Sequence, residues 1–300
     1  MRTMNMPRST LPAPLDAERF EIAGRAGRLV AFVAGEGPPL LLVHSVNAAA
    51  SAAELRPLHE HHRRSRTVFS IDLPGYGLSE RSDREYTPRL MTDAVLDLLD
   101  LVRARCGAAP VDALALSLGC EFLARAAVEQ PDAFRSLAFV SPTGLAGGKT
   151  RRGPPGSTLK MAWLLTLLRG PGWGGALFRG LTRPGVIRYF LERTWGAKTI
   201  DEELWRYDVL TTRQPGAEYA PLHFLSGALF SADIQDVYER IAVPVWMSHG
   251  VRGDFTDYRA YPTLSPARPW RVAVYETGAF PHFERADTFC ADHDAFLAST

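Results

Sequence analysis

The stretch VDALALSLGCEF, residues 111–122, decides the fold of this chain. Its first six residues are mostly small and apolar and predict a buried strand, while the residues from Gly119 onward predict a helix. One hydroxyl, Ser117, lies at the corner between the two, with Ala115 and Gly119 on either side. Taken alone, the stretch fits two roles for this serine. It can cap the helix, or it can be a reactive group held on a tight turn.

The pattern around this corner repeats along the chain. Continuous apolar runs predict strands buried on both faces, and segments with helical spacing alternate with them, which predicts a mostly parallel sheet flanked by helices. In the longest predicted helix, Thr87 is placed to cap and Pro88 suits the first turn. The predicted strands cover residues 19–24, 28–35, 39–45, 67–73, 111–117, 135–142, 244–250 and 270–278, and the predicted helices cover 86–107, 118–130 and 285–300.

One region breaks this alternation. Residues 143–236 contain no convincing buried strand, begin with a passage rich in Gly, Pro and Arg, and hold Trp163, Trp173, Trp195 and Trp205. We expect a helical insertion that forms a lid over one end of the sheet, with most of these tryptophans in its core and one or two lining a pocket. The predicted organisation is a disordered leader (1–15), a core (16–142 and 237–300) and the insertion (143–236).

The overall composition excludes some classes of partner. With 34 basic and 33 acidic residues the formal net charge is +1, which gives no reason to expect nucleic acid or an anionic membrane. The charged run HEHHRRSR, residues 59–66, is interpreted as a solvated helix end rather than a phosphate site.

The cysteines and the apolar runs indicate the compartment. Cys106, Cys120 and Cys290 are too few and too widely spaced for a disulfide framework or a metal motif, which favours a reducing compartment. The N-terminal residues lack a signal-peptide core, and no apolar run approaches the length of a membrane span. We therefore expect a soluble, cytoplasmic protein.

Two later loops supply the residues that a reactive serine needs. A serine hydroxyl becomes a good nucleophile only when a base takes its proton, and that base needs a carboxylate to orient it. Asp254 and Asp257 follow the predicted strand 244–250, and His282 follows the strand 270–278. The chain order is thus serine, aspartate, histidine.

These features together resemble the α/β-hydrolase family in its lidded form. The resemblance implies a mostly parallel central sheet flanked by helices, with a helical lid insertion. Two departures stand out: the usual His-Gly turn reads His44-Ser45, and Asp254 comes one residue later than is common, which leaves Asp257 as an alternative acid. The matching motifs, in chain order, are LLVHS (41–45), DLPGYGLS (72–79), ALSLG (115–119), HGVRGD (249–254) and GAFPHFE (278–284).

The resemblance also implies a mechanism. Ser117 would attack a carbonyl, His282 would take its proton and Asp254 would hold the imidazole. The oxyanion would be bound by the backbone N–H groups of Leu118 and Val46, with Asn47 the next candidate after Val46. No metal ion and no organic cofactor are expected.

Three functions remain open from sequence. The first is a carboxylesterase acting on a small or medium apolar ester, as a monomer or homodimer. The second is hydrolysis of a carbon–carbon bond beside a ketone, as in ring-cleavage-product hydrolases. That reaction predicts a basic or polar pocket, and the insertion holds Arg151, Arg152, Arg169, Arg179, Arg183 and Arg188. The third is a small-molecule receptor with the same fold.

The remaining polar residues near these motifs receive structural interpretations. His44 is expected at the base of the oxyanion loop, and Cys120 as a packed small residue. His249 and His223 carry no specific prediction of catalysis.

Overall fold

The computed structural model describes residues 11–148, 150–170 and 173–300, and its centre is an eight-stranded sheet. The strand order is β1-β2-β4-β3-β5-β6-β7-β8. Strand β2 is antiparallel to both of its neighbours, β1 and β4, and the six strands β4, β3, β5, β6, β7 and β8 are parallel to one another. This confirms the predicted fold class. The strands are β1 Glu18–Gly24, β2 Gly27–Ala34, β3 Pro39–Val43, β4 Thr67–Asp72, β5 Val111–Leu116, β6 Phe134–Val140, β7 Val245–Gly250 and β8 Arg271–Tyr275.

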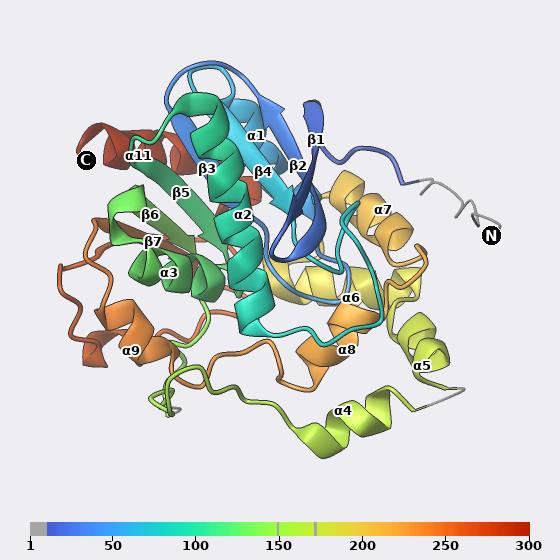
Figure 1. The fold of residues 1–300 in the computed structure, drawn as a ribbon. Helices are drawn as coiled ribbons and strands as arrows, with labels where there is room; N and C mark the ends of the chain where they lie inside the picture. Colours follow the sequence, from blue (N-terminus) through green and yellow to red (C-terminus); the bar gives the residue numbers. More distant parts are fainter. Residues whose placement is uncertain (1–10, 149, 171–172) are drawn as a thin grey trace.

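Helices cover both faces of the sheet (Figure 1). Helices α2 (Pro88–Cys106) and α3 (Gly119–Glu129) pack on one face, and α1 (Arg56–His62) and α11 (Ala286–Ala298) pack on the other. Each face carries its own cluster of buried apolar side chains. The central strands are buried on both faces for this reason, which is why they appear in the sequence as continuous apolar runs.

Helix α2 begins and ends where its sequence predicts. The Thr87 hydroxyl accepts a hydrogen bond from the backbone N–H of Leu90 at 3.2 Å, and Pro88 occupies the first turn. Gly107 follows the last turn with φ 89°, a conformation that side chains with a Cβ rarely adopt.

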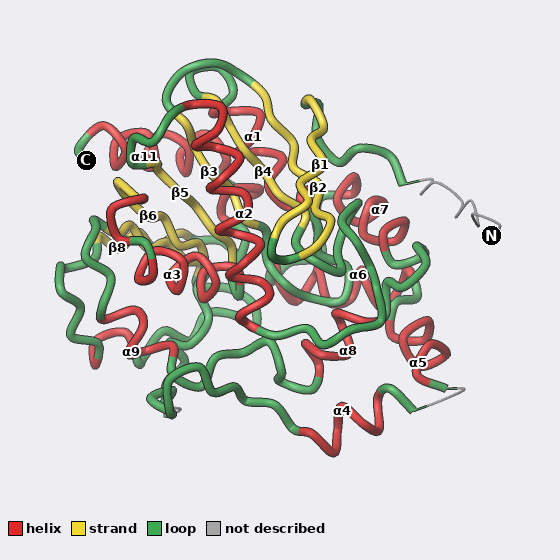
Figure 2. The backbone as a smooth tube through the Cα atoms, viewed as in Figure 1, coloured by secondary structure: helices red, strands yellow, loops and turns green. Residues whose placement is uncertain are grey.

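Among the described residues between β6 and β7, the regular elements are helices, apart from one isolated bridge between Thr158 and Ser231. Figures 1 and 2 show these helices gathered along one end of the sheet. They contact the loops that follow β3 and β4: Arg81 donates to the Thr211 carbonyl, and Arg56 pairs with Asp201. The helices are α4 Ala162–Leu168, α5 Gly174–Leu181, α6 Pro184–Trp195, α7 Glu202–Thr211, α8 Tyr219–Leu225 and α9 Ile234–Glu239.

The leader differs from its prediction. Residues 1–10 of the expected disordered segment lie outside the described residues. Residues 11–15 instead pack against the protein: Leu11 and Leu15 are buried in the apolar cluster beneath α1 and α11, and the Pro12 carbonyl accepts from the Tyr207 hydroxyl at 2.9 Å. The burial of two leucine side chains favours one packed conformation of this segment over a disordered one.

The run HEHHRRSR is also less solvated than expected. His59 and His62 are fully buried between α1 and the sheet, and the Nδ1 of His59 lies 2.9 Å from the Ser70 hydroxyl. Glu60 and His61 between them are only half-buried, because α1 is amphipathic, and the charge of the run conceals this pattern. None of the described helices combines the length and the apolar composition that crossing a bilayer requires.

Candidate active site

Ser117 lies on a strained turn between β5 and α3. Its φ is 49°, in the left-handed region that residues with a side chain rarely occupy. The turn is fixed by a hydrogen bond from the Ser117 N–H to the Val140 carbonyl at 2.8 Å and by one from the Cys120 N–H to the Ser117 carbonyl at 3.1 Å. Such a turn holds the serine outside both the strand and the helix, as in a nucleophile elbow.

The glycine of this turn is required by close packing. A Cβ added to Gly119 would lie 2.4 Å from the His44 carbonyl oxygen, well inside van der Waals contact. The start of α3 therefore lies directly against the residues that follow β3. On the other side of the serine, Ala115 is buried and pairs with Val43 of β3. The small residues of ALSLG thus bring the serine turn and the β3 loop together.

His44 has a structural role in that loop. Its Nε2 accepts the Leu73 N–H at 2.9 Å, so the proton is on Nδ1, which faces the Ser45 carbonyl at 2.5 Å. Burial lowers the pKa of His44 to about 4 and keeps the ring neutral. The ring ties the β3 loop to the end of β4.

Glu54 organises the oxyanion loop, a role that the sequence analysis missed. This carboxylate is buried and accepts hydrogen bonds from the Ser45 N–H and the Ser45 hydroxyl, both at 2.9 Å, and from the Asn47 amide at 2.8 Å. Ser45, the departure from the usual glycine, therefore anchors the loop. Burial raises the pKa of Glu54 to about 7. The sequence feature that could have indicated this role is that Glu54 is the single acidic residue in the alanine-rich segment 45–54.

Val46 and Leu118 are buried on either side of the contact between Gly119 and His44. Within the described part of the chain, neither of their backbone N–H groups donates a hydrogen bond to another residue. Buried N–H groups are normally paired, so two unpaired ones beside an elbow serine are a pair of donors for a ligand oxygen. The backbone N–H of Asn47, the next candidate, also donates no hydrogen bond to another described residue, while its side-chain amide is bonded to Glu54.

His282 is fully buried on α10 (Pro281–Glu284), but its hydrogen bonds are not those of a working triad. Its Nε2 lies 2.9 Å from the Glu54 carbonyl, which can only accept, so Nε2 carries the proton. Its Nδ1 has no hydrogen-bond partner among the described residues. In a triad the Nε2 takes the serine proton and Nδ1–H points at the acid. Burial lowers the pKa of His282 to about 4.

Neither predicted acid contacts His282 in this structure. Asp254, with its side chain 40% exposed, forms a paired hydrogen bond with the Arg193 guanidinium, one arm of which is 2.8 Å long. Asp257 accepts from the Gly147 N–H at 3.1 Å and from Arg259 at 2.9 Å, and these bonds hold its pKa well below its usual range. The predicted hydrogen bond between Asp254 and His282 is therefore absent here.

The C-terminal turn of α6 lies between the acid loop and the histidine loop. The Arg193 carbonyl accepts the Asp254 N–H at 3.2 Å, and the Thr194 carbonyl accepts the Ala279 N–H at 2.8 Å. A Cβ on Gly278 would lie 2.2 Å from the Thr194 carbonyl, so the approach depends on that glycine. This turn of the insertion is what holds Asp254 away from His282.

The tryptophans of the insertion are more exposed than predicted. Trp163 and Trp173 are exposed on the surface, which corrects their expected place in the core. Trp195 is buried, and its ring packs against those of Phe280 and Phe283 at 5.3 and 5.7 Å between centroids. Trp195 is therefore the one of these three whose ring packs against rings of the histidine loop among the described residues.

Other buried polar groups face the same end of the sheet. Asp208 on α7 is buried, one of its carboxylate oxygens has no partner among the described residues, and burial with nearby Glu54 raises its pKa well above the usual range. The Tyr76 hydroxyl and the Nε2 of His223 are likewise buried without a described partner. Burial disfavours the charged form of each group, because it raises the pKa values of Asp208 and Tyr76 and lowers that of His223.

Two more residues match their structural interpretations. The thiol of Cys120 is buried and donates to the Ala115 carbonyl, and burial raises its pKa well above the usual range, so it is unreactive. His249 stacks on Tyr258 with 4.1 Å between ring centroids.

The comparisons with known proteins agree with this architecture. Residues 38–173 match the family model described as alpha/beta hydrolase fold, and no curated protein matches the chain. The chain is similar in structure to a serine hydrolase involved in carbazole degradation, with a TM-score of 0.72 and 14% identity over 95% of this chain and 100% of that one.

Two further solved structures are similar. One is a carboxylesterase from Bacillus subtilis (TM-score 0.68, 17% identity, 96% of this chain and 93% of that one). The other is 2-hydroxy-6-oxo-6-phenylhexa-2,4-dienoate hydrolase from Rhodococcus sp. strain RHA1 (TM-score 0.67, 18% identity, 91% and 96%). At these identities the likeness concerns the fold. With the sheet order, the strained serine turn and the family match over residues 38–173 together, the chain has the α/β-hydrolase fold.

Proposed function

We propose that this protein is a serine hydrolase that cleaves a carboxylic ester of small or medium size, with Ser117 as the nucleophile. The observation that carries the proposal is the turn itself. Ser117 is held at φ 49° directly beside a loop that offers an unpaired backbone N–H, with a second unpaired N–H one residue after the serine. Backbone strain of this kind persists only where surrounding structure enforces it, and it is typical of reactive groups.

The reaction proceeds in two acyl-transfer steps. Ser117 attacks the ester carbonyl while His282 takes its proton, and the tetrahedral oxyanion is bound by the N–H groups of Val46 and Leu118. Each such donor typically lowers the barrier by roughly 3 kcal/mol. His282 then protonates the departing alcohol, and water releases the acid from Ser117 by the reverse sequence.

Asp254 becomes the triad acid only after a local rearrangement. The Arg193 guanidinium must release its carboxylate, and His282 must turn Nε2 from the Glu54 carbonyl toward Ser117. The acid loop begins close to the histidine loop, since the N–H groups of Val251 and Arg252 both donate to the Thr277 carbonyl at 2.9 Å. We propose that substrate binding moves the end of α6 and completes the triad.

The charges around the site favour an uncharged ester over an acidic substrate of carbon–carbon hydrolysis. Arg151, Arg152, Arg169 and Arg188, which were candidates for a basic pocket, pair with Glu121, Glu239, Asp83 and Glu202. The unpaired buried groups facing the site are instead the carboxyl of Asp208 and the hydroxyl of Tyr76. A carboxylate substrate would lie near the acids Glu54 and Asp208, which disfavours it. Among the described residues Arg81 is the cation of this region that is bonded to uncharged oxygens alone, those of Gly77 and Thr211.

The decisive experiment measures initial rates on p-nitrophenyl esters of increasing acyl length for the wild type, Ser117→Ala and Ser248→Ala. Ser248 is a matched control because it is a buried serine on β7 whose hydroxyl has no partner among the described residues. We expect Ser117→Ala to lower kcat/KM by about 10⁴-fold or more and Ser248→Ala to leave it near the wild-type value. Labelling of Ser117 by a fluorophosphonate gives an independent readout.

The possible outcomes of these measurements distinguish the candidate functions. Equal activity in wild type and Ser117→Ala would exclude this serine as the nucleophile. A wild type that is inert to every ester but labelled at Ser117 would keep the nucleophile and exclude simple esters, which favours the carbon–carbon reaction. A wild type that is neither active nor labelled, and that binds small ligands, would support a receptor of this fold instead.

A further inference from the structure

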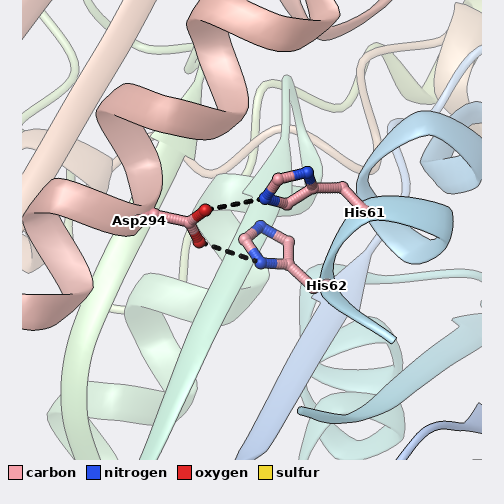
Figure 3. Close-up of side chains that lie close together, drawn as sticks. All are labelled: His61, His62 and Asp294. Carbon is pink, nitrogen blue, oxygen red and sulfur yellow. Dashed lines mark hydrogen bonds and ion pairs between the residues drawn. The ribbon is translucent and has the colours of Figure 1, made fainter. Parts of the chain in front are cut away.

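A second cluster of reactive side chains lies far from Ser117, between α1 and α11. Helix α1 ends at His62, shortly before β4 begins at Thr67, so this cluster is at the amino end of the parallel strands, whereas Ser117 follows the carboxyl end of β5. Figure 3 shows His61 and His62 at the end of α1 pointing at Asp294 on α11. The cluster is therefore independent of the proposed active site.

The ligand atoms of the three residues converge. The Nε2 of His61 lies 2.7 Å from one carboxylate oxygen of Asp294, and the Nδ1 of His62 lies 3.4 Å from the other. One ligand atom from each residue lies within 4.8 Å of the others. Four ligands around zinc at about 2.0–2.2 Å require spacings of about 3.3 Å. The contact between His61 and Asp294 would therefore have to widen by roughly half an ångström, and the widest spacing in the cluster, up to 4.8 Å, would have to narrow.

The protonation of the buried ring suits a metal ligand. His62 is fully buried, and both of its ring nitrogens face other side chains of the cluster. Its Nε2 lies 2.9 Å from the Nδ1 of His293, and its Nδ1 makes no hydrogen bond within the described residues. If Nε2–H donates to His293, the lone pair of Nδ1 points at the space shared with Asp294.

The surroundings support this arrangement. His293 stacks on Trp246 with 5.4 Å between ring centroids, which fixes the ring that would accept from His62. The nearest cation, Arg66, is already bonded to the Asp112 carboxylate at 2.8 Å. Asp294 and His61 are partly exposed, so an ion can enter from solvent and keep a water as its fourth ligand.

We propose that His61 Nε2, His62 Nδ1 and the Asp294 carboxylate form a binding site for a divalent transition-metal ion, with zinc the best match to two imidazoles and one carboxylate. Bound there, the ion would tie α1 to α11. Helix α11 directly follows α10, which carries His282, so the site would fix the element behind the histidine loop.

The test is a titration of the full-length, untagged protein with zinc chloride after treatment with a chelator, followed by calorimetry. We expect one ion per chain in a Cys106→Ser background, which removes the exposed thiol. Asp294→Asn should weaken binding by about tenfold or more, and so should His61→Asn. Asp287→Asn, at an exposed position of the same helix, is the matched control and should bind like the parent protein.

Thermal melting with and without zinc gives a second readout. Zinc should raise the melting temperature of the parent and of Asp287→Asn but not of Asp294→Asn. Both exposed ligands can be replaced without opening the core, so a loss of binding with unchanged circular dichroism is specific to the site. Absence of stoichiometric binding, or binding that survives both Asp294→Asn and His61→Asn, would overturn the proposal.

Discussion

The two halves of the candidate site differ in how completely they are built. On the serine side, β3 and β5 are neighbours in the sheet, and their C-terminal loops are held together by the packing of Gly119 on the His44 carbonyl. The bonds of Glu54 to Ser45 and Asn47 fix the β3 loop itself. On the acid and histidine side, Asp254 and His282 lie on loops that are separated by the last turn of α6.

This difference follows from what supports each half. The serine side rests on parallel strands buried on both faces, so its geometry is set by the core. The acid side rests on contacts with an inserted helix that lies outside the sheet. The ion pair between Arg193 and Asp254 is partly exposed, and exposed contacts are more easily rearranged than those of a core. The comparison predicts that the serine side is preformed and that the acid side reaches its catalytic arrangement only when substrate binds.

Replacing the acid gives the largest expected effect. If Asp254 joins His282 during turnover, Asp254→Asn should lower kcat for a good ester substrate by about 10³- to 10⁴-fold, since a triad without its acid holds the wrong imidazole tautomer. Initial rates at saturating substrate measure this. Asp257→Asn is the matched control, an aspartate of the same loop bonded to Arg259, and we expect it to retain near wild-type kcat.

Arg193→Gln sharpens the same comparison, because it removes the cation that holds Asp254. We expect its kcat/KM to rise by severalfold, since the carboxylate is then free to reach His282. If Asp254→Asn and Arg193→Gln both leave the rates unchanged, the acid of this site is another residue and the proposed assembly is wrong.

The serine side is also the part that sequence predicts well. Strand, turn and helix at 111–129 follow from local periodicity and from the small residues around Ser117, and the structure has them at those positions. The bond of Asp254 to Arg193 joins residues 61 apart in sequence, through an insertion whose packing leaves no periodic signal. The burial of His59 and His62 was missed for a related reason, because charge masked the helical pattern.

A substitution at Gly119 should break the preformed half. A methyl group there would lie 2.4 Å from the His44 carbonyl, so α3 and the oxyanion loop must move apart. We expect Gly119→Ala to lower the free energy of unfolding by about 2 kcal/mol, as overpacking does. Displacement of one oxyanion donor should lower kcat about 100-fold. Denaturant titration and ester rates measure the two effects.

Gly185→Ala is the control for this change. Gly185 lies in the first turn of α6, and an added Cβ there meets nothing within 4 Å. It should therefore retain activity. A fully active Gly119→Ala would show that the contact with His44 is not needed to position the Leu118 donor.

The smallest expected effect concerns the charge of Glu54, which the preformed half keeps buried. The pKa of Glu54 is about 7 in the folded protein, against 4.5 for a glutamate side chain exposed to water in the unfolded chain. Because the folded value is the higher one, the folded state binds the proton more tightly. The stabilisation from that proton is complete below pH 4.5 and is lost as pH rises through 7. Across this window it amounts to about 3 kcal/mol.

Comparing wild type with Glu54→Gln isolates this contribution, because the buried histidines, whose pKa values are lowered, affect both proteins alike. We expect the free energy of unfolding of the wild type to fall relative to Glu54→Gln between pH 5 and 8, as measured by denaturant titration at several pH values. Parallel stability curves for the two proteins would mean that Glu54 stays ionised through its bonds to Ser45 and Asn47. The oxyanion loop would then be held by a buried charge, and its rigidity would not depend on pH in this range.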